Sequence, residues 1–298
     1  MSAICFSFPQ DAHLGGKLAA AIGAEHQLLD IHEFPDGETL VKLRGDCARR
    51  RVILICGGHL PNASALPAYF AAHTARSMGA STVGLVSPYL AYMRQDTQFH
   101  DGEAVSALSY ARFLSSAFDW LVTVDPHLHR MKTLDTVFTI PASSVSSMPA
   151  VADWIRVNVS DPVLVGPDRE STQWAEAVAR RLGCPWTILE KTRTGDRDVT
   201  VSLSDAGVLL GRTPVIVDDI VSSGRTLVET IRALGGLGAA PVTCAVVHAL
   251  FSADTESAIR EAGAARLVST NTVAHATNEI DVVPLMVEPI RVLLRDST

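Results

Sequence analysis

The stretch Val215–Leu227, VIVDDIVSSGRTL, decides the fold. It begins with an apolar, β-branched run that is typical of a buried strand, and continues through two carboxylates and a turn of small residues into the start of a helix. In an open α/β sheet, ligands bind beyond the carboxyl ends of the strands, so Asp218 and Asp219 are expected to point into a crevice. The stretch therefore predicts a strand-to-helix unit with a ligand site at its turn.

The same alternation of short apolar runs and longer segments of helical period continues along the whole chain. It is the pattern of a mainly parallel sheet covered by helices on both faces, and it predicts an α/β fold. The predicted strands cover 3–8, 51–57, 82–87, 120–125, 162–166, 186–190, 213–218 and 242–249, and the predicted helices cover 62–78, 103–117, 171–182 and 225–236.

Length favours two domains, because 298 residues is about twice a typical domain of roughly 150. The segment Pro141–Pro149, PASSVSSMP, is rich in Ser and bounded by Pro, which is typical of a linker. We place the boundary near residue 145 and expect domains at 1–145 and 146–298.

The two halves resemble each other weakly, which makes an internal duplication plausible. Cys56-Gly57-Gly58 precedes one predicted helix as Leu164–Asp168 precedes another, and strands 121–125 and 215–219 both end in Asp. The offsets between these pairs drift, so a fixed repeat period is absent.

Composition excludes several classes of protein. The net charge of −7 argues against general nucleic-acid binding, which depends on neutralising phosphates. No apolar run reaches the roughly 18 to 20 residues that a membrane span needs, and the N-terminus lacks a signal-peptide pattern. The five cysteines are scattered without a C-x-x-C pair and fit buried thiols. We expect a cytoplasmic protein without nucleic-acid or membrane partners.

The turn after Asp218 and Asp219 has the chemistry of a sugar-phosphate site. Two carboxylates suit the vicinal hydroxyls of a ribose, and the backbone N–H groups of residues 222–226 at a helix start favour an anion. A plain tight turn with Ser223 as the helix N-cap is the alternative. The segment resembles the phosphoribosyl diphosphate (PRPP) loop that type I phosphoribosyltransferases and PRPP synthases share. This resemblance implies ribose 5-phosphate binding by Asp218, Asp219, Ser222, Ser223, Gly224, Arg225 and Thr226.

A second polar run, Met93–Glu103, MRQDTQFHDGE, follows a predicted strand. Arg94 offers a planar fork suited to phosphates, Gln95 can read an adenine edge, and Asp96 can hold Arg94 in place. A solvated Arg–Asp surface pair is the alternative, and the residues alone favour it. The run closely resembles the R-Q-D signature with which PRPP synthases bind ATP, and this implies that Arg94 and Gln95 bind ATP.

The run Phe34–Glu38, FPDGE, is by itself a turn. It resembles the PRPP synthase loop that contacts adenine from a neighbouring subunit. By that resemblance Phe34, Asp36 and Glu38 contact the base, and the protein is a homo-oligomer built on a dimer.

Two further segments match the same family near a metal. In VDPHLHR, two histidines stand two residues apart without the partners of a zinc site. The resemblance implies that His127 contacts ATP phosphates and Mg²⁺. Asp168, in LVGPDRES, is a helix cap when read alone; the resemblance places it near ribose 5-phosphate and the metal. His129 receives no role.

The stretch Glu190–Val201, EKTRTGDRDVTV, is polar and contains a glycine, as do loops that close over substrates. A solvated β-hairpin is the alternative. In the family, the Lys and Arg of the corresponding loop stabilise the transferring phosphates, which implies catalytic roles for Lys191 and Arg193. Arg197 is not assigned.

These matches cover nearly the whole chain in the family's order, and the chain is identified as a member of the PRPP synthase family. The resemblance implies two tandem type I phosphoribosyltransferase-like domains. It also implies transfer of the diphosphate of MgATP to the C1 hydroxyl of ribose 5-phosphate. Ser222 and Arg225 depart from the family, which mostly has Asp and a small residue there. A phosphoribosyltransferase that consumes PRPP and a non-catalytic regulatory relative stay as alternatives.

Overall fold

The computed structural model describes residues 2–98, 100–128, 131, 133–193, 199–203, 207–239 and 241–296, with the backbone alone at 190–193, 199–203 and 296. The chain forms two compact units. Unit 1 comprises Met1–Ser146, Thr272–Ala274 and Val282–Thr298, and unit 2 comprises Ser147–Asn271 and His275–Asp281.

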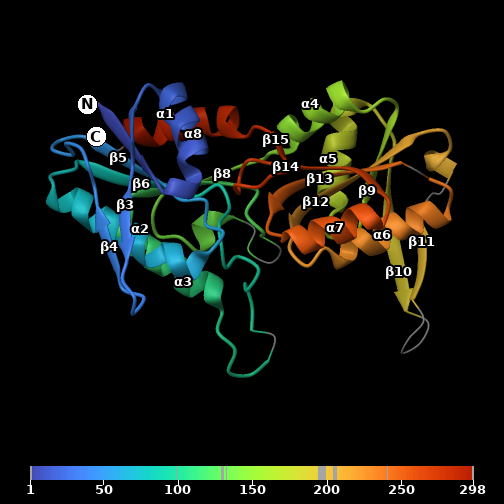
Figure 1. Ribbon diagram of the computed structural model, residues 1–298, viewed down its shortest axis with the longest axis horizontal. Helices are drawn as coiled ribbons and strands as arrows, with labels where there is room; N and C mark the ends of the chain where they lie inside the picture. Colours follow the sequence, from blue (N-terminus) through green and yellow to red (C-terminus); the bar gives the residue numbers. More distant parts are fainter. Residues whose placement is uncertain are drawn as a thin grey trace. The chain divides into compact units, whose positions relative to one another are not determined.

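Unit 1 contains a six-stranded parallel sheet in the order β2-β1-β5-β6-β7-β8 and a separate antiparallel hairpin, β3-β4. Helices α1 and α8 cover one face of the sheet, and α2 and α3 cover the other (Figure 1). The strands are β1 Ala3–Ser7, β2 Glu25–Leu28, β3 Asp30–Glu33, β4 Thr39–Lys42, β5 Arg51–Ile55, β6 Thr82–Val86, β7 Trp120–Val124 and β8 Ala142–Val145; the helices are α1 Ala12–Ile22, α2 Pro61–Ser77, α3 Ser106–Ala117 and α8 Val283–Asp296.

Unit 2 contains a seven-stranded sheet in the order β11-β10-β9-β12-β13-β14-β15, parallel except for the pairing of β10 with β11. Helices α4 and α5 lie on one face, and α6 and α7 lie on the other (Figure 1). The strands are β9 Pro162–Gly166, β10 Trp186–Arg193, β11 Val199–Leu203, β12 Thr213–Val221, β13 Val242–Ala249, β14 Ala264–Thr270 and β15 Asn278–Ile280; the helices are α4 Met148–Asn158, α5 Thr172–Leu182, α6 Arg225–Gly236 and α7 Ala253–Glu261.

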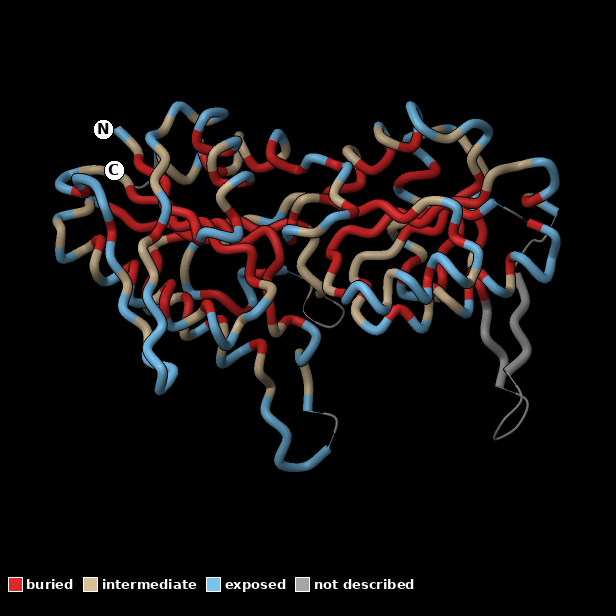
Figure 2. The backbone as a smooth tube through the Cα atoms, viewed as in Figure 1, coloured by how far each residue is buried: buried red, intermediate tan, exposed pale blue. Residues whose placement is uncertain are grey.

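The central strands form the core of each unit, as the buried segments of Figure 2 show. Strands covered on both faces are nearly continuous apolar runs, and β6 and β7 are buried at every residue. Gly84 in β6 is required by packing, because a Cβ there would lie 2.0 Å from the ring of Trp120. Among the described residues, no helix is long and apolar enough to cross a membrane.

The two sheets share one strand order, which supports the duplication but changes how the halves correspond. If β2 and β1 are matched with β10 and β9, then β5, β6, β7 and β8 match β12, β13, β14 and β15. The stretch after Cys56 therefore corresponds to the turn after Asp218, and the stretch after β1 corresponds to the one that contains Asp168. The pairings expected from sequence likeness were wrong, because they compared β5 with β9 and β7 with β12.

The two units divide between Ser146 and Ser147, inside the predicted segment 141–149, but most of that segment is not a linker. Ala142–Val145 forms the edge strand β8, and α4 begins at Met148. Small polar residues are tolerated at a sheet edge, so the Ser-rich composition hid a strand. The described C-terminal helix α8 packs against α1 and β7 in unit 1, so residues 282–298 fall outside the unit to which the expected second domain assigned them.

Candidate active site

Three carboxylates gather at the edge of the unit 2 sheet where the neighbouring parallel strands β9 and β12 end. Asp168 follows β9 by two residues, and Asp218 and Asp219 lie near the C-terminal end of β12. Burial raises the pKa of the Asp218 carboxyl well above its usual range, and the negative charges of Asp219 and Asp168 raise it further. This concentration of negative charge is suited to a cation or to hydroxyl donors.

The carboxylates are partly held by local hydrogen bonds. The Asp219 N–H donates to Asp218 Oδ1 at 3.1 Å, and the Ile220 N–H donates to Asp219 Oδ1 at 2.8 Å. The Ser171 N–H donates to Asp168 Oδ1 at 3.0 Å, so Asp168 holds the N-cap residue of α5 and is not itself the cap. Among the described residues, no hydrogen bond engages Asp168 Oδ2. This local hydrogen bond and a role toward a ligand are therefore compatible.

The turn between β12 and α6 consists of half-buried Ser222, exposed Ser223 and buried Gly224. Gly224 has φ +69°, and a Cβ there would lie 2.5 Å from Thr255 Cγ2. Glycine is therefore required both by the backbone conformation and by the lack of space for a side chain. In the described part of the chain, the N–H groups of residues 222–226 donate no hydrogen bond. The N-cap is Gly224, without a side-chain bond, so the alternative of Ser223 as a capping side chain was wrong. The turn has the form of an anion site.

Arg225 is the first residue of α6 and is exposed. It makes no ion pair with any residue that the structure describes. A cation at a helix N-terminus opposes the helix dipole, so its own helix does not stabilise this guanidinium.

In unit 1, Phe34–Glu38 forms the tip of the β3-β4 hairpin. The Phe34 N–H donates to the Glu38 carbonyl at 2.8 Å, and the Glu38 N–H donates to Asp36 Oδ1 at 3.1 Å. The Phe34 ring is 39% exposed. The turn is confirmed, and contact with a base stays a prediction.

Arg94 and Gln95 lie in the segment between β6 and α3. The Gln95 backbone is fixed at both ends, because its N–H donates to the Tyr92 carbonyl at 3.1 Å and its carbonyl accepts from the Ala107 N–H at 3.2 Å. Both side chains are exposed, and within the described ranges Arg94 has no hydrogen bond or ion pair. The expectation that Asp96 holds Arg94 in place was therefore wrong. The guanidinium of Arg94 is available to a ligand.

His127 follows β7 by three residues and is half-buried. Because β6 and β7 are parallel neighbours, it lies after the strand next to the one that precedes Arg94. No three His, Cys, Asp or Glu side chains form a metal cluster among the described residues. Magnesium is held by few protein groups together with substrate oxygens. The carboxylate oxygens of Asp168, Asp218 and Asp219 are ligands of the type that it prefers.

Lys191 and Arg193 belong to the backbone of β10, opposite Val201 and Val199 of β11. The polar stretch is thus hairpin-like, while the positions of both side chains, with Arg197 and His129, lie outside the described residues. Their roles stay predictions.

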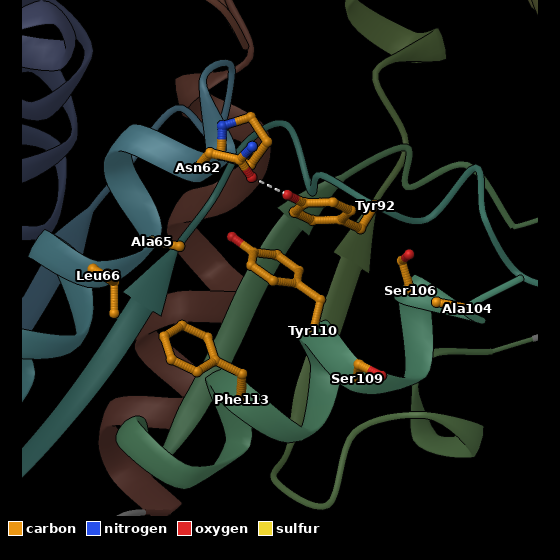
Figure 3. Close-up of a pocket in the computed structure, with 10 residues that line it drawn as sticks. Asn62, Ala65, Leu66, Tyr92, Ala104, Ser106, Ser109, Tyr110 and Phe113 are labelled. Carbon is orange, nitrogen blue, oxygen red and sulfur yellow. Dashed lines mark hydrogen bonds between the residues drawn. The ribbon is translucent and has the colours of Figure 1, made fainter.

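A cavity of about 470 Å³ in unit 1 was not predicted (Figure 3). Its lining comes from the start of α2, from Tyr92 and from α3. Because these segments are far apart in the sequence, no local pattern announces the cavity.

Comparisons with known proteins show the family and agree with the fold. Residues 3–117 match the family described as the N-terminal domain of ribose phosphate pyrophosphokinase, and residues 135–279 match the phosphoribosyl transferase domain. Ribose-phosphate pyrophosphokinase from Methanothermobacter thermautotrophicus is 32% identical over 283 residues, which cover 92% of this chain and 96% of that protein. The enzyme of the same name from Methanopyrus kandleri is 32% identical over 289 residues, 96% of this chain and 98% of that one.

The crystal structure of phosphoribosylpyrophosphate synthetase from Mycobacterium smegmatis has the same fold, with a TM-score of 0.87, 21% identity and coverage of 99% of this chain and 100% of that one. The predicted α/β fold with two phosphoribosyltransferase-like domains and the predicted family are confirmed. The chain belongs to the ribose-phosphate pyrophosphokinase family.

Proposed function

We propose that this protein transfers the diphosphate of MgATP to the C1 hydroxyl of ribose 5-phosphate, giving PRPP and AMP. The observation that carries the proposal is the end of β12, where the half-buried carboxylates of Asp218 and Asp219 meet a helix start whose N–H groups donate no hydrogen bond among the described residues. Membership of the family supports the choice of making PRPP over consuming it.

Ribose 5-phosphate binds in unit 2. Asp218 and Asp219 accept hydrogen bonds from the ring hydroxyls, and each such charge-assisted bond is worth about 1.5–3 kcal/mol. The turn of residues 222–226 binds the 5-phosphate through its N–H groups, with Arg225 adding a positive charge. The carboxylates thus bind the sugar, and the helix start binds the phosphate.

ATP binds in unit 1 through Arg94, Gln95 and His127. The exposed guanidinium of Arg94 is suited to phosphates, and Phe34, Asp36 and Glu38 of a second copy contact the base. A homo-oligomer built on a dimer is part of the proposal for this reason.

For Mg²⁺ we propose two protein contacts, His127 in unit 1 and Asp168 in unit 2, each acting with substrate oxygens; the ion would offset the charge of the phosphates. The fit rests on the free Oδ2 of Asp168 and on the negative field that raises the pKa of Asp218. Ion binding would relieve that field.

The chemical step joins O1 of ribose 5-phosphate to the β-phosphorus of ATP while the bond between the β-phosphorus and the bridging oxygen breaks. AMP leaves with that oxygen, and the proton of the C1 hydroxyl is released to solvent. Reactions of this class need positioning and charge stabilisation more than covalent help. Lys191 and Arg193 supply that stabilisation in the transition state.

The direct test is to incubate the protein with MgATP and ribose 5-phosphate and to measure AMP and PRPP. We expect equal amounts of both products. Absence of AMP under varied metal and phosphate concentrations would overturn the proposal, and consumption of PRPP with a nucleobase would favour a phosphoribosyltransferase instead.

The role of Lys191 has its own test. Lys191→Ala is expected to lower kcat by about 10²–10³ while binding of both substrates is largely kept, because the lost charge acts in the transition state. Lys17→Ala, at an exposed position of α1, is the matched control and is expected to keep full turnover. Undiminished turnover in Lys191→Ala would exclude the assigned role.

A further inference from the structure

The turn between β12 and α6 is supported by the segment 250–255, which connects β13 to the first turn of α7. Because β12 and β13 are parallel neighbours, α6 and α7 begin at the same edge of the unit 2 sheet and lie on the same face of it (Figure 1). The segment contacts the turn at two points, one before Ser222 and one after Ser223.

The first contact is a backbone hydrogen bond directly before the turn. The Leu250 N–H donates to the carbonyl of Val221, the last residue of β12, at 2.9 Å. This bond extends the pairing of β12 with β13, in which Val221 lies opposite Ala249. The Val221 side chain is buried. The chain therefore enters the turn from a fixed position.

The second contact is made by a methyl group at the end of the turn. A Cβ on Gly224 would lie 2.5 Å from Thr255 Cγ2 and 3.3 Å from Ile259 Cδ1, so side chains of α7 fill the space beside this buried glycine. Glycine has the widest choice of backbone conformations and no side chain of its own to restrict it. The contact with Thr255 therefore restrains the residue of the turn that most needs restraint.

Thr255 is itself held at the start of α7. Its N–H donates to Oγ of Ser252, the N-cap residue, at 3.4 Å, and the Glu256 N–H donates to the Ser252 carbonyl at 2.9 Å. Ile259, one helical turn further on, is completely buried. The Thr255 methyl group thus projects from an anchored helix start.

The position of Gly224 matters for the N–H groups around it. Those of residues 222–226 donate no hydrogen bond in the described part of the chain, so no internal acceptor fixes their directions. An anion is bound well only when several N–H groups point at it together. The Val228 N–H donates to the Gly224 carbonyl at 2.9 Å, so the start of α6 depends on the same residue.

We propose that Thr255 is a positioning residue for the phosphate-binding turn. Its methyl group holds Gly224, so that the N–H groups of residues 222–226 stay directed at the phosphate of ribose 5-phosphate, while Thr255 itself does not touch the substrate. The inference deepens the proposed function and rests on it, because the ligand of the turn comes from that proposal. Thr255 accordingly sets the affinity for the sugar phosphate and leaves the chemical step unchanged.

Two substitutions separate the methyl group of Thr255 from its hydroxyl. Thr255→Ser removes Cγ2 and keeps the hydroxyl, whereas Thr255→Val keeps a methyl group and removes the hydroxyl. Ser257→Ala, at an exposed position of the same helix, is the matched control. Titration calorimetry with ribose 5-phosphate, steady-state kinetics and hydrogen exchange of the Val228 N–H in the ligand-free protein are measured for each, and thermal unfolding verifies that each variant is folded.

We expect Thr255→Ser to raise the Kd and KM for ribose 5-phosphate about 3- to 10-fold, the value of one lost methyl contact. The kcat and the KM for ATP should stay unchanged, because the turn holds the phosphate equally in the ground state and the transition state. The Val228 N–H should exchange faster, since the start of α6 opens more often. Thr255→Val and Ser257→Ala should behave like the wild type.

A double variant tests the contact itself. Gly224→Ala should weaken binding of ribose 5-phosphate about 10- to 100-fold, because the new Cβ meets Thr255 Cγ2 and the positive φ disfavours alanine. In this background Thr255→Ser removes the nearest obstructing atom. It should therefore strengthen binding, which is the opposite of its effect in the wild type.

Unchanged ribose 5-phosphate binding and unchanged Val228 exchange in Thr255→Ser would overturn the inference. Equal losses in Thr255→Ser and Thr255→Val, or no recovery in the double variant, would overturn it as well. Absence of ribose 5-phosphate binding in the wild type would refute the ligand of the turn and the inference with it. Binding without formation of AMP would refute the proposed function alone.

Discussion

The ends of β5 and β12 occupy the same position in two sheets that share a six-strand order, apart from the additional strand β11, and the two ends differ in what their backbone N–H groups contact. After β12, the N–H groups of residues 222–226 have no partner in the described part of the chain. After β5, the Gly57 N–H donates to Asp11 Oδ2 at 2.8 Å. Asp11 is buried at the start of α1, and a Cβ on Gly57 would lie 2.4 Å from its Oδ1.

The difference teaches that the fold supplies the place for an anion and the local sequence decides what fills it. In unit 1 an internal carboxylate accepts from the turn, so the position is already occupied. In unit 2 the N–H groups of the turn donate no hydrogen bond among the described residues, and β12 carries Asp218 and Asp219, whereas β5 ends in apolar Ile55 and is followed by Cys56. We therefore propose that only one of the two similar sheets carries a sugar-phosphate site.

The largest expected effect comes from removing the carboxylates of unit 2. Replacing Asp218 and Asp219 together with Asn should lower kcat/KM for ribose 5-phosphate by about 10²–10⁴, since two charge-assisted bonds of about 1.5–3 kcal/mol each are lost. The matched change Asp11→Asn in unit 1 should alter it by less than about threefold. An equal loss in Asp11→Asn, measured by steady-state kinetics, would end the distinction between the two strand ends.

A medium effect is expected at the occupied turn of unit 1. Asp11→Ala should lower the free energy of unfolding by about 1–3 kcal/mol, because the buried Gly57 N–H loses its acceptor. Asp11→Asn keeps a hydrogen-bond acceptor for Gly57. It also removes a carboxyl group whose pKa is raised by burial, so this variant should keep its stability at neutral pH. Urea unfolding of both variants measures the difference, and equal losses would show that the hydrogen bond contributes nothing.

The smallest effect concerns pH. The pKa of Asp218 is raised in the folded protein, so folding favours its protonated form, and the cost of the charge appears as pH rises through the folded pKa. Asp218→Asn should therefore raise the Tm of the ligand-free protein at pH 7, by roughly 2–4 °C for each kcal/mol. The gain should vanish as the pH falls below the ordinary carboxyl range; a gain independent of pH would point to packing instead of charge.

The central strands could be predicted from sequence, and the edges of the sheets could not. Strands covered on both faces are apolar throughout, and β5 and β12 were located within a few residues. The edge strands β2 and β8, EHQL and ASSV, carry too few apolar residues to stand out. The attachment of α8 to unit 1 was missed because an apolar stripe does not specify which sheet it covers.

The site followed the same rule of locality. The groups of the sugar-phosphate turn lie within nine residues, from Asp218 to Thr226, so elementary chemistry described them before any resemblance was needed. Groups proposed to bind ATP come from three separate segments, and only family resemblance connected them. The cavity of unit 1 could not be predicted, because its lining residues come from segments that are brought together only by folding.

The central claim, that only the open turn of unit 2 binds the sugar phosphate, is tested most directly by the stoichiometry of ribose 5-phosphate. Titration calorimetry of the wild-type chain should give one bound molecule per chain, and none with Asp218 and Asp219 both replaced by Asn. Two molecules per chain, or one that survives the double replacement, would contradict the account.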